Sequence, residues 1–289
     1  MNDISPAVVL AAFGTTDMAA MQNILNIKNM VASAFPEAEV RLALTSAFVR
    51  RHWRRLAARP GFAAGHPEIP AEILHAAGPL SVLADLADSG PRPMVLQSLH
   101  VAEGKEFSDL NLLVEQLTAM RGAKGAPFPD LRLGEPALGN GSFPYLRRMA
   151  AGLTPLVKEA GKRKAALVLV GHGGENAPAQ TYIELEAVMR QMYGPDIHIG
   201  LIEGKPGVDD ILASMISEPA KPRRVFMAPL LLVAGSHAQK DMAGEDGWAN
   251  RFRAAGFTVE MFPGSLSSFY FFNSIFIEHI EKIFTRHPA

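Results

Sequence analysis

The sequence predicts an α/β protein built from two similar domains, each with a parallel sheet, and a cleft between them. Short apolar runs alternate with segments of helical periodicity along the whole chain, which is typical of parallel sheets covered by helices. The same order of elements then starts again near the middle of the chain. A stretch rich in glycine, proline and small residues, 134–142, separates the two halves. Open parallel sheets bind ligands at the carboxyl ends of their strands, so two facing units would place those ends around one cleft.

The first half begins with an expected buried strand, Ala7–Phe13, followed by the turn Gly14-Thr15-Thr16. The next segment has apolar residues at helical spacing up to Val31, and Phe35-Pro36 ends it because the residue before proline disfavours helical backbone. The remaining elements expected in this half, in order, are a strand at 39–44, a helix from about 48, a strand at 94–101 and a helix over 110–117.

The second half repeats the alternation. Its expected elements, in order, are a helix over 146–161, a strand at 165–170, a helix over 182–192, a strand at 197–202, a helix over 208–216, a strand at 224–233, a helix over 238–255 and a strand at 258–262. We therefore expect an N-terminal domain of residues 1–138, joined by a C-terminal helix at 265–289, and a C-terminal domain of residues 139–264.

The composition excludes several classes of function. The 28 basic and 29 acidic residues nearly cancel, so no overall positive field favours nucleic acid. The absence of cysteine excludes disulfides, thiolate nucleophiles and iron–sulfur clusters, and leaves histidine, carboxylate or carbonyl oxygen to hold any metal. The most apolar stretch, Val225–Ala234, is too short to span a bilayer, and residues 1–6 lack the basic start of a signal peptide. We expect a cytoplasmic protein without a membrane partner.

Three polar residues follow expected strands of the second half. They are His172, Glu203 and His237. Parallel strands end at the same edge of a sheet, so these side chains can converge although they are far apart in sequence. Two imidazoles and one carboxylate suit Co²⁺, Fe²⁺, Ni²⁺ or Zn²⁺, and three protein ligands leave positions open for chemistry.

The motifs around these residues resemble one family. The segments Val170-Gly-His-Gly, Ile202-Glu-Gly and especially the run from Pro229 to Asp246 are similar to the anaerobic cobalt chelatases of cobalamin synthesis (the CbiK type). The resemblance extends from about residue 8 to about 260, and its upstream motifs occur in the same order: Ala12-Phe-Gly-Thr-Thr, Ala34-Phe-Pro, Leu44-Thr-Ser and Gln97-Ser-Leu-His-Val. One segment departs from it, because Ser265–Phe272 replaces a Gly-Glu-Asn-Pro-like stretch.

The resemblance implies a class II chelatase fold with two Rossmann-like halves. It implies insertion of Co²⁺ into sirohydrochlorin without a nucleotide, with His172, Glu203 and His237 as metal ligands and catalytic residues. Ligand type does not separate Co²⁺ from Fe²⁺, so a ferrochelatase of sirohaem synthesis remains an alternative. A tetrapyrrole or metal carrier without catalysis is another, and a homo-oligomer is possible.

Further residues at expected strand ends of the first half are candidates for substrate contact: Phe13, Gly14, Thr15, Ser98, Leu99 and His100. Arg54 joins them from the basic run Arg50–Arg55, because the substrate carries many carboxylates. A solvated helix face explains this run equally well, and a structural role is the simpler interpretation of His100.

Other enzyme classes lack their motifs. The Gly-His-Gly-Gly sequence at 171–174 is not accompanied by the Gly-x-Ser-x-Gly elbow of α/β-hydrolases. Asn176 occupies the third glycine position of a dinucleotide-binding fingerprint, and neither a phosphate-binding P-loop nor a His-Glu-x-x-His zinc motif occurs.

Overall fold

The computed structural model describes residues 5–122, 125–174, 179–217 and 223–286, and within these ranges the side chains of 236–239 and 286 are not described. The chain divides into two compact units. Unit 1 contains residues 1–100, 106–136 and 273–289, and unit 2 contains residues 101–105 and 137–272. The division near 136 lies two residues before the expected boundary, and the C-terminal segment returns to unit 1 at residue 273.

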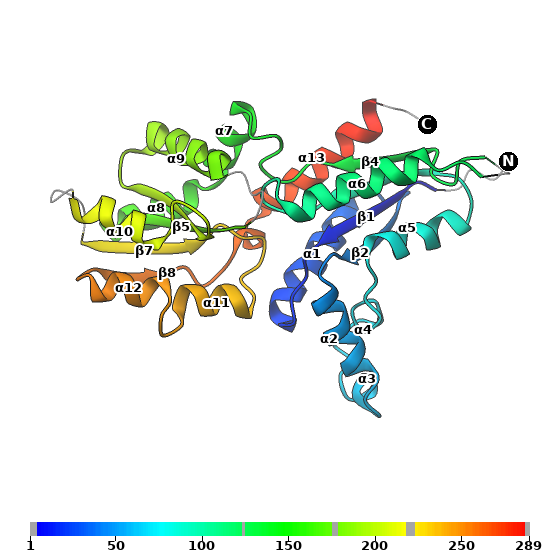
Figure 1. Cartoon of the computed structure of the whole chain (residues 1–289), viewed down its shortest axis with the longest axis horizontal. Coiled ribbons are helices and arrows are strands. Elements are labelled where there is room, and N and C mark those ends of the chain that lie inside the picture. The colour runs from blue at the N-terminus through cyan, green and yellow to red at the C-terminus, as the bar shows by residue number, and fades with distance from the viewer. Residues whose placement is uncertain (1–4, 123–124, 175–178, 218–222, 287–289) are drawn as a thin grey trace. The chain divides into compact units, whose positions relative to one another are not determined.

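Unit 1 is built on a four-stranded parallel sheet in the order β2-β1-β3-β4 (Figure 1). Its strands are β1 (Ala7–Ala12), β2 (Glu39–Leu44), β3 (Pro93–Ser98) and β4 (Asp130–Gly134). β1 is fully buried between β2 and β3, with Ala7 opposite both Glu39 and Met94. The sequence predicts the first three strands but not β4, an edge strand whose polar alternation gives it no continuous apolar run.

The helices of unit 1 are α1 (Met18–Ala34), α2 (Ala47–Ala57), α3 (Phe62–Gly65), α4 (Ala71–Leu74), α5 (Pro79–Asp88), α6 (Lys105–Ala119) and most of α13 (Tyr270–Arg286). Asp17 caps α1 by accepting a hydrogen bond from the amide of Ala20 at 2.7 Å. The helix ends at Phe35, directly before Pro36, as the sequence predicts. α13 rejoins unit 1 through an edge-on contact between the rings of Phe35 and Phe284.

Unit 2 repeats the same topology with the strand order β6-β5-β7-β8, all parallel. Its strands are β5 (Ala166–Gly173), β6 (Ile197–Glu203), β7 (Arg224–Pro229) and β8 (Thr258–Met261). The predicted pair of similar α/β units with parallel sheets is therefore confirmed. The buried parts of β5 and β6 end before the strands do. Each strand therefore carries an exposed residue near its carboxyl end.

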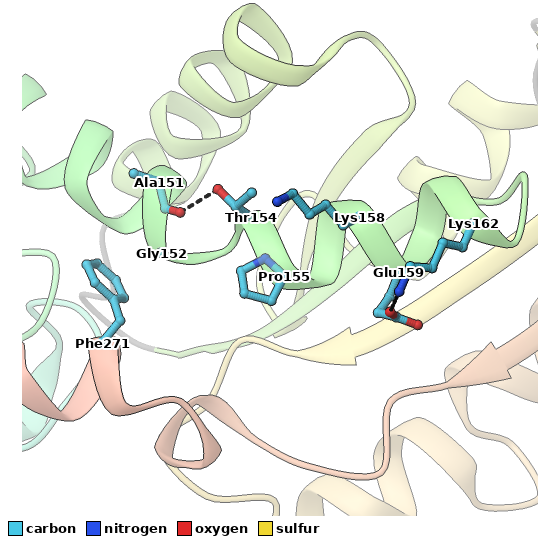
Figure 2. Close-up of a pocket in the computed structure, with 8 residues that line it drawn as sticks. All are labelled: Ala151, Gly152, Thr154, Pro155, Lys158, Glu159, Lys162 and Phe271. Atoms are coloured by element: carbon cyan, nitrogen blue, oxygen red, sulfur yellow. Dashed lines mark hydrogen bonds and ion pairs between the residues drawn. The ribbon is translucent and has the colours of Figure 1, made fainter.

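The helices of unit 2 are α7 (Phe143–Gly152), α8 (Thr154–Lys162), α9 (Ala179–Tyr193), α10 (Val208–Ser217), α11 (Ser236–Ala243) and α12 (Trp248–Ala254), with a short 3₁₀ turn η1 (Leu266–Ser268). Two predicted helices are wrong, because each is broken in two. Pro155 has no N–H to continue the helix over 146–161, and the Thr154 hydroxyl donates to the Ala151 carbonyl instead at 2.5 Å (Figure 2). The predicted helix over 238–255 breaks at Gly244 and Gly247, whose tight turn leaves no room for side chains.

Each unit has its own apolar core on its sheet. In unit 2 the core includes Val168, Val170, Trp248 and Phe252, the last fully buried. No helix in the described ranges combines the length and apolar character needed to cross a bilayer.

Candidate functional site

His172 and Glu203 lie at the carboxyl ends of neighbouring strands. The register of β5 and β6 pairs Gly171 with Leu201 and Gly173 with Glu203, so His172 and Glu203 are offset by one position across the strand pair. Paired strands lie about 4.8 Å apart. Both side chains are exposed, and both end a strand whose preceding part is buried. The structure thus places the backbones of two of the three predicted metal ligands at the same carboxyl edge of the sheet.

The turn after His172 is packed directly against the backbone of Glu203. Gly173 and Gly174 have φ values of +75° and +112°, the left-handed region that favours glycine. The amide of Gly174 donates to the carbonyl of Glu203 at 2.9 Å. A Cβ on Gly173 would overlap that same carbonyl oxygen, well inside the 3.0 Å that real Cβ atoms respect. The two glycines therefore fix His172 relative to Glu203. The glycine pair is visible in the sequence. Its contact with the Glu203 carbonyl can be identified only from the register of the two strands.

The His172 imidazole is arranged to offer one ring nitrogen. Nδ1 lies 3.3 Å from the carbonyl oxygen of Gly173, and since a carbonyl only accepts, Nδ1 carries the proton in this contact. In the neutral ring Nε2 then keeps a lone pair. A neutral imidazole nitrogen and an exposed carboxylate on the next strand are suitable ligands for a divalent transition metal.

His237 lies further from its strand than the sequence predicts. β7 ends at Pro229 instead of continuing to 233, because the carbonyls of Leu231 and Leu232 accept hydrogen bonds from Leu266 and Ser267 outside the sheet. His237 is the second residue of α11, and its side chain lies outside the described residues. Among the residues that are described, no three histidine, aspartate or glutamate side chains are grouped as a metal site. The role of His237 remains a prediction.

Two of the cavities formed by described residues lie in unit 2. The smaller, about 320 Å³, is next to Glu203 and is lined by residues of the β6–α10 connection and by Trp248. The larger, about 590 Å³, runs along α8 between Lys162 and Phe271 (Figure 2). It contains neither His172 nor Glu203, so we attach the candidate chemistry to the sheet edge and not to the larger cavity.

In unit 1 the segment after β1 carries an exposed aromatic ring on a fixed backbone. Phe13 is 48% exposed, whereas Thr15 is buried. Gly14 has a φ of +89° and packs against Leu44 and Val49. The indole nitrogen of Trp53 donates to the Thr15 carbonyl at 2.9 Å. Of the three candidates in this turn, the side chain of Phe13 is the one that the fold leaves open.

The candidates after β3 are mostly buried. Ser98 and Leu99 are 0% and 1% exposed, and the Leu99 amide donates to the Ala11 carbonyl. The Ser98 hydroxyl contacts His100 Nδ1 at 2.9 Å and accepts from the His100 amide at 3.3 Å. His100 Nε2 is buried and has no hydrogen-bond partner among the residues that the structure describes. Burial lowers the pKa of His100 to about 4, against a smaller opposing effect of the Glu106 charge, so the ring is neutral near pH 7.

We expect His100 to make stability depend on pH. Its pKa is about 4 in the folded chain against 6.5 when unperturbed, so between these values the unfolded state binds the extra proton. Stability is then fully present above pH 6.5 and falls as the pH drops towards 4, by up to about 3 kcal/mol. Urea unfolding at pH 7.5 and pH 5 should show a smaller loss for His100→Gln than for the unmodified chain. Equal losses would show that this imidazole is not responsible.

Arg54 is anchored in part by the backbone. Its Nε donates to the Ala76 carbonyl at 2.9 Å, while the neighbouring Arg50 donates to the carbonyls of Leu44 and Thr45. Arg54 is nevertheless exposed, so its terminal nitrogens remain near solvent.

Comparisons with known proteins agree with the motifs. The sequence model of the cobalt chelatase (CbiK) family matches residues 6–285. The sirohydrochlorin cobaltochelatase CbiKC of Nitratidesulfovibrio vulgaris is 30% identical over 276 residues, which cover 94% of this chain and 88% of that protein. The sirohydrochlorin cobaltochelatase of Salmonella typhimurium is 27% identical over 280 residues, covering 96% and 95%.

Solved structures share the fold at much lower identity. SirB from Bacillus subtilis with Fe³⁺ superposes with a TM-score of 0.58 at 9% identity, covering 96% of this chain and 95% of that one. The sirohydrochlorin chelatase SirB from Bacillus subtilis subspecies spizizenii in complex with cobalt gives 0.57 at 11% identity, covering 97% and 95%. At these identities the likeness establishes the chelatase fold alone. Since the family model spans nearly the whole sequence, this chain belongs to the cobalt chelatase (CbiK) family.

Proposed function

We propose that this chain inserts Co²⁺ into sirohydrochlorin in anaerobic cobalamin synthesis, without using ATP. The observation that carries the proposal is the placement of His172 and Glu203 at adjacent strand ends, in a chain that the cobalt chelatase family model matches over residues 6–285. Cobalt is here a substrate that the site must release, which agrees with an exposed site of few protein ligands.

The metal is proposed to be held by His172, Glu203 and His237. The lone pair of His172 Nε2 binds Co²⁺ directly, while the Glu203 carboxylate lowers the cost of bringing a dication close to the macrocycle. His237 completes the set by its motif position. The open coordination positions accept the ring nitrogens as the metal leaves the protein.

Insertion also requires that both pyrrole N–H protons leave the macrocycle as the metal–nitrogen bonds form. Neutral histidine and ionised glutamate are the ordinary general bases at neutral pH. As the metal leaves, His172 and Glu203 regain free lone pairs, so each can accept one of these protons. No phosphoryl transfer is needed for this exchange, which agrees with the absence of a P-loop sequence.

The macrocycle itself is proposed to contact the carboxyl edge of the unit 1 sheet. Phe13 offers an exposed ring, Gly14 and Thr15 hold its backbone, and Arg54 offers a cation for a carboxylate. The buried Ser98-Leu99 segment is proposed to position His100 through the contact of the serine hydroxyl with Nδ1.

The test is multiple turnover in vitro. Purified chain is mixed under anaerobic conditions with excess sirohydrochlorin and Co²⁺, without nucleotide, and the visible spectrum is followed. Conversion of many equivalents per chain supports the proposal, whereas one stoichiometric change would indicate a carrier. A parallel reaction with equal Co²⁺ and Fe²⁺ decides between the cobalt and iron chelatases, and preferential formation of the iron product would overturn the assignment to cobalt.

A further inference from the structure

The arginines of α2 fall into two groups that differ in their partners. Arg50 and Arg54 are tied to backbone carbonyls of the adjacent loops. Arg51, Arg55 and the following Arg59 are exposed, and in the described part of the chain they have no hydrogen bond, ion pair or ring contact through their side chains. At 100° per residue, Arg51 and Arg55 lie on the face opposite the buried Val49 and Trp53. We call Phe48, Arg51, Arg55 and Arg59 the α2 arginine stripe.

Among the residues that the structure describes, no carboxylate forms an ion pair with the arginines of this stripe. The sequence contains six arginines and no aspartate or glutamate between Glu39 and Glu68. Three nearby acids are already engaged elsewhere: Glu68 with His66 at 3.0 Å, Glu72 with Lys28 at 2.6 Å, and Glu39 with Arg92 at 2.9 Å. Burial, and then the positive charges of Arg54 and Arg51, lower the pKa of Arg50. The contribution of the two charges is what a local excess of positive charge produces. An uncompensated cluster of this kind favours an anionic ligand.

The stripe begins beside exposed aromatic rings. Phe48 is 61% exposed and Phe13 is 48% exposed. The backbone brings their segments together, since the amide of Ser46 contacts the Phe13 carbonyl at 3.3 Å. Two open rings next to unpaired guanidinium groups offer stacking and charge together, which suits a flat molecule with carboxylates on its rim.

We propose that the α2 arginine stripe, with Phe13, is a capture surface for the polycarboxylate macrocycle. This inference rests on the proposed function for the identity of the ligand. The arginines bind the rim carboxylates and raise the rate at which the anion reaches the protein, while the rings contact its flat face. Contacts of this kind stabilise the bound macrocycle and the transition state of insertion equally. Their loss therefore raises KM and leaves kcat unchanged.

The test compares two variants with the same change in net charge. The stripe variant carries Arg51→Gln, Arg55→Gln and Arg59→Gln, and the control carries Arg121→Gln, Lys158→Gln and Arg253→Gln, which are also exposed. Metal-free sirohydrochlorin is titrated at low and high salt. We expect the stripe variant to bind about tenfold more weakly at low salt and to lose much of the salt dependence, with the control close to the unmodified chain. In turnover, KM for the macrocycle should rise while kcat is retained.

The aromatic contribution is tested separately with Phe48→Ala, for which Leu112→Ala, at an exposed apolar residue of unit 1, is the control. Equal titrations of the stripe and control variants would overturn the proposal. The proposal would also be overturned if an RNA or DNA oligonucleotide bound more tightly than the macrocycle and the stripe variant no longer bound that oligonucleotide. Because the titration contains no metal, its outcome is independent of whether cobalt is inserted. If the unmodified chain did not turn over, the proposed function would be rejected. The binding titration would still test whether the stripe captures the macrocycle.

Discussion

Replacing His172 with alanine is expected to lower the rate of cobalt insertion by about 10²-fold or more, because the variant loses both a metal ligand and a proton acceptor. The same loss is expected for His237→Ala on the basis of its motif position. His172 is exposed, and within the described part of the chain its ring hydrogen-bonds only to the carbonyl of Gly173, so the substitution should leave the melting temperature nearly unchanged. Initial rates of the change in the visible spectrum, measured at several Co²⁺ concentrations, provide the check.

A matched control separates the site from histidine content in general. His75→Ala removes another exposed imidazole, from the end of α4 in unit 1, and should retain full activity. Glu203→Gln keeps the size of the side chain and removes its charge, so it should reduce the affinity for Co²⁺. Insertion by His172→Ala at the rate of the unmodified chain would exclude His172 from the chemistry.

The sequence is sufficient to predict the sheets wherever strands are buried apolar runs. β1 and β5 are examples, since their apolar side chains are buried in the cores of the two units. The sequence does not predict β4, because it is an edge strand that contains polar residues. Arg132 and Asp130 form an ion pair within it, and they interrupt the apolar pattern. The breaks at Pro155 and Gly244 are signalled by the residue types, but helical periodicity on both sides hides them.

The candidate site is predicted in part for the same reason. Residues after apolar runs must lie at strand ends, which was enough to select His172 and Glu203. The contact between Gly173 and the Glu203 carbonyl depends on the register between two strands that are distant in sequence, and no local pattern encodes that register. The sequence places His237 directly after a strand, because residues 230–233 are apolar. In the structure these residues are not part of the sheet, so His237 lies further from the strand end.

The repeated topology shows how the two halves have diverged. Aligning β1 with β5 places Phe13 at the position of His172 and Gly14 at that of Gly173. The register of β1 with β2 then gives Ser46 the position of Glu203, and Ser46 caps α2 through its hydroxyl contact with the Val49 amide. Unit 1 thus keeps the glycine turn but presents an aromatic ring and an arginine-rich helix, while unit 2 presents the proposed metal ligands.

The substitution Gly173→Ala should impair both stability and activity. Its φ of +75° is unfavourable for alanine, and its Cβ would overlap the Glu203 carbonyl oxygen. Left-handed strain and overpacking each cost about 1–3 kcal/mol, so we expect a loss of about 2–6 kcal/mol in the free energy of unfolding. Relief of the overlap must separate the backbone of residue 173 from the Glu203 carbonyl, which changes the position of His172 relative to Glu203. Cobalt insertion should therefore fall by tenfold or more, as a change of about an ångström in catalytic geometry can cost 10²-fold.

Gly256→Ala is the matched control for this prediction. Gly256 has a similar φ of +87°, but a Cβ there meets nothing within 4 Å, so the variant carries the backbone strain without the overlap. Urea unfolding of the two variants isolates the cost of the close approach, and Co²⁺ titration of each isolates its effect on the metal. If Gly173→Ala loses no more stability than Gly256→Ala and still inserts cobalt at an undiminished rate, the spacing between His172 and Glu203 does not depend on this glycine. A larger loss in both measurements would mean that the turn after β5 sets the distance between the two proposed ligands, because the added methyl group overlaps the Glu203 carbonyl.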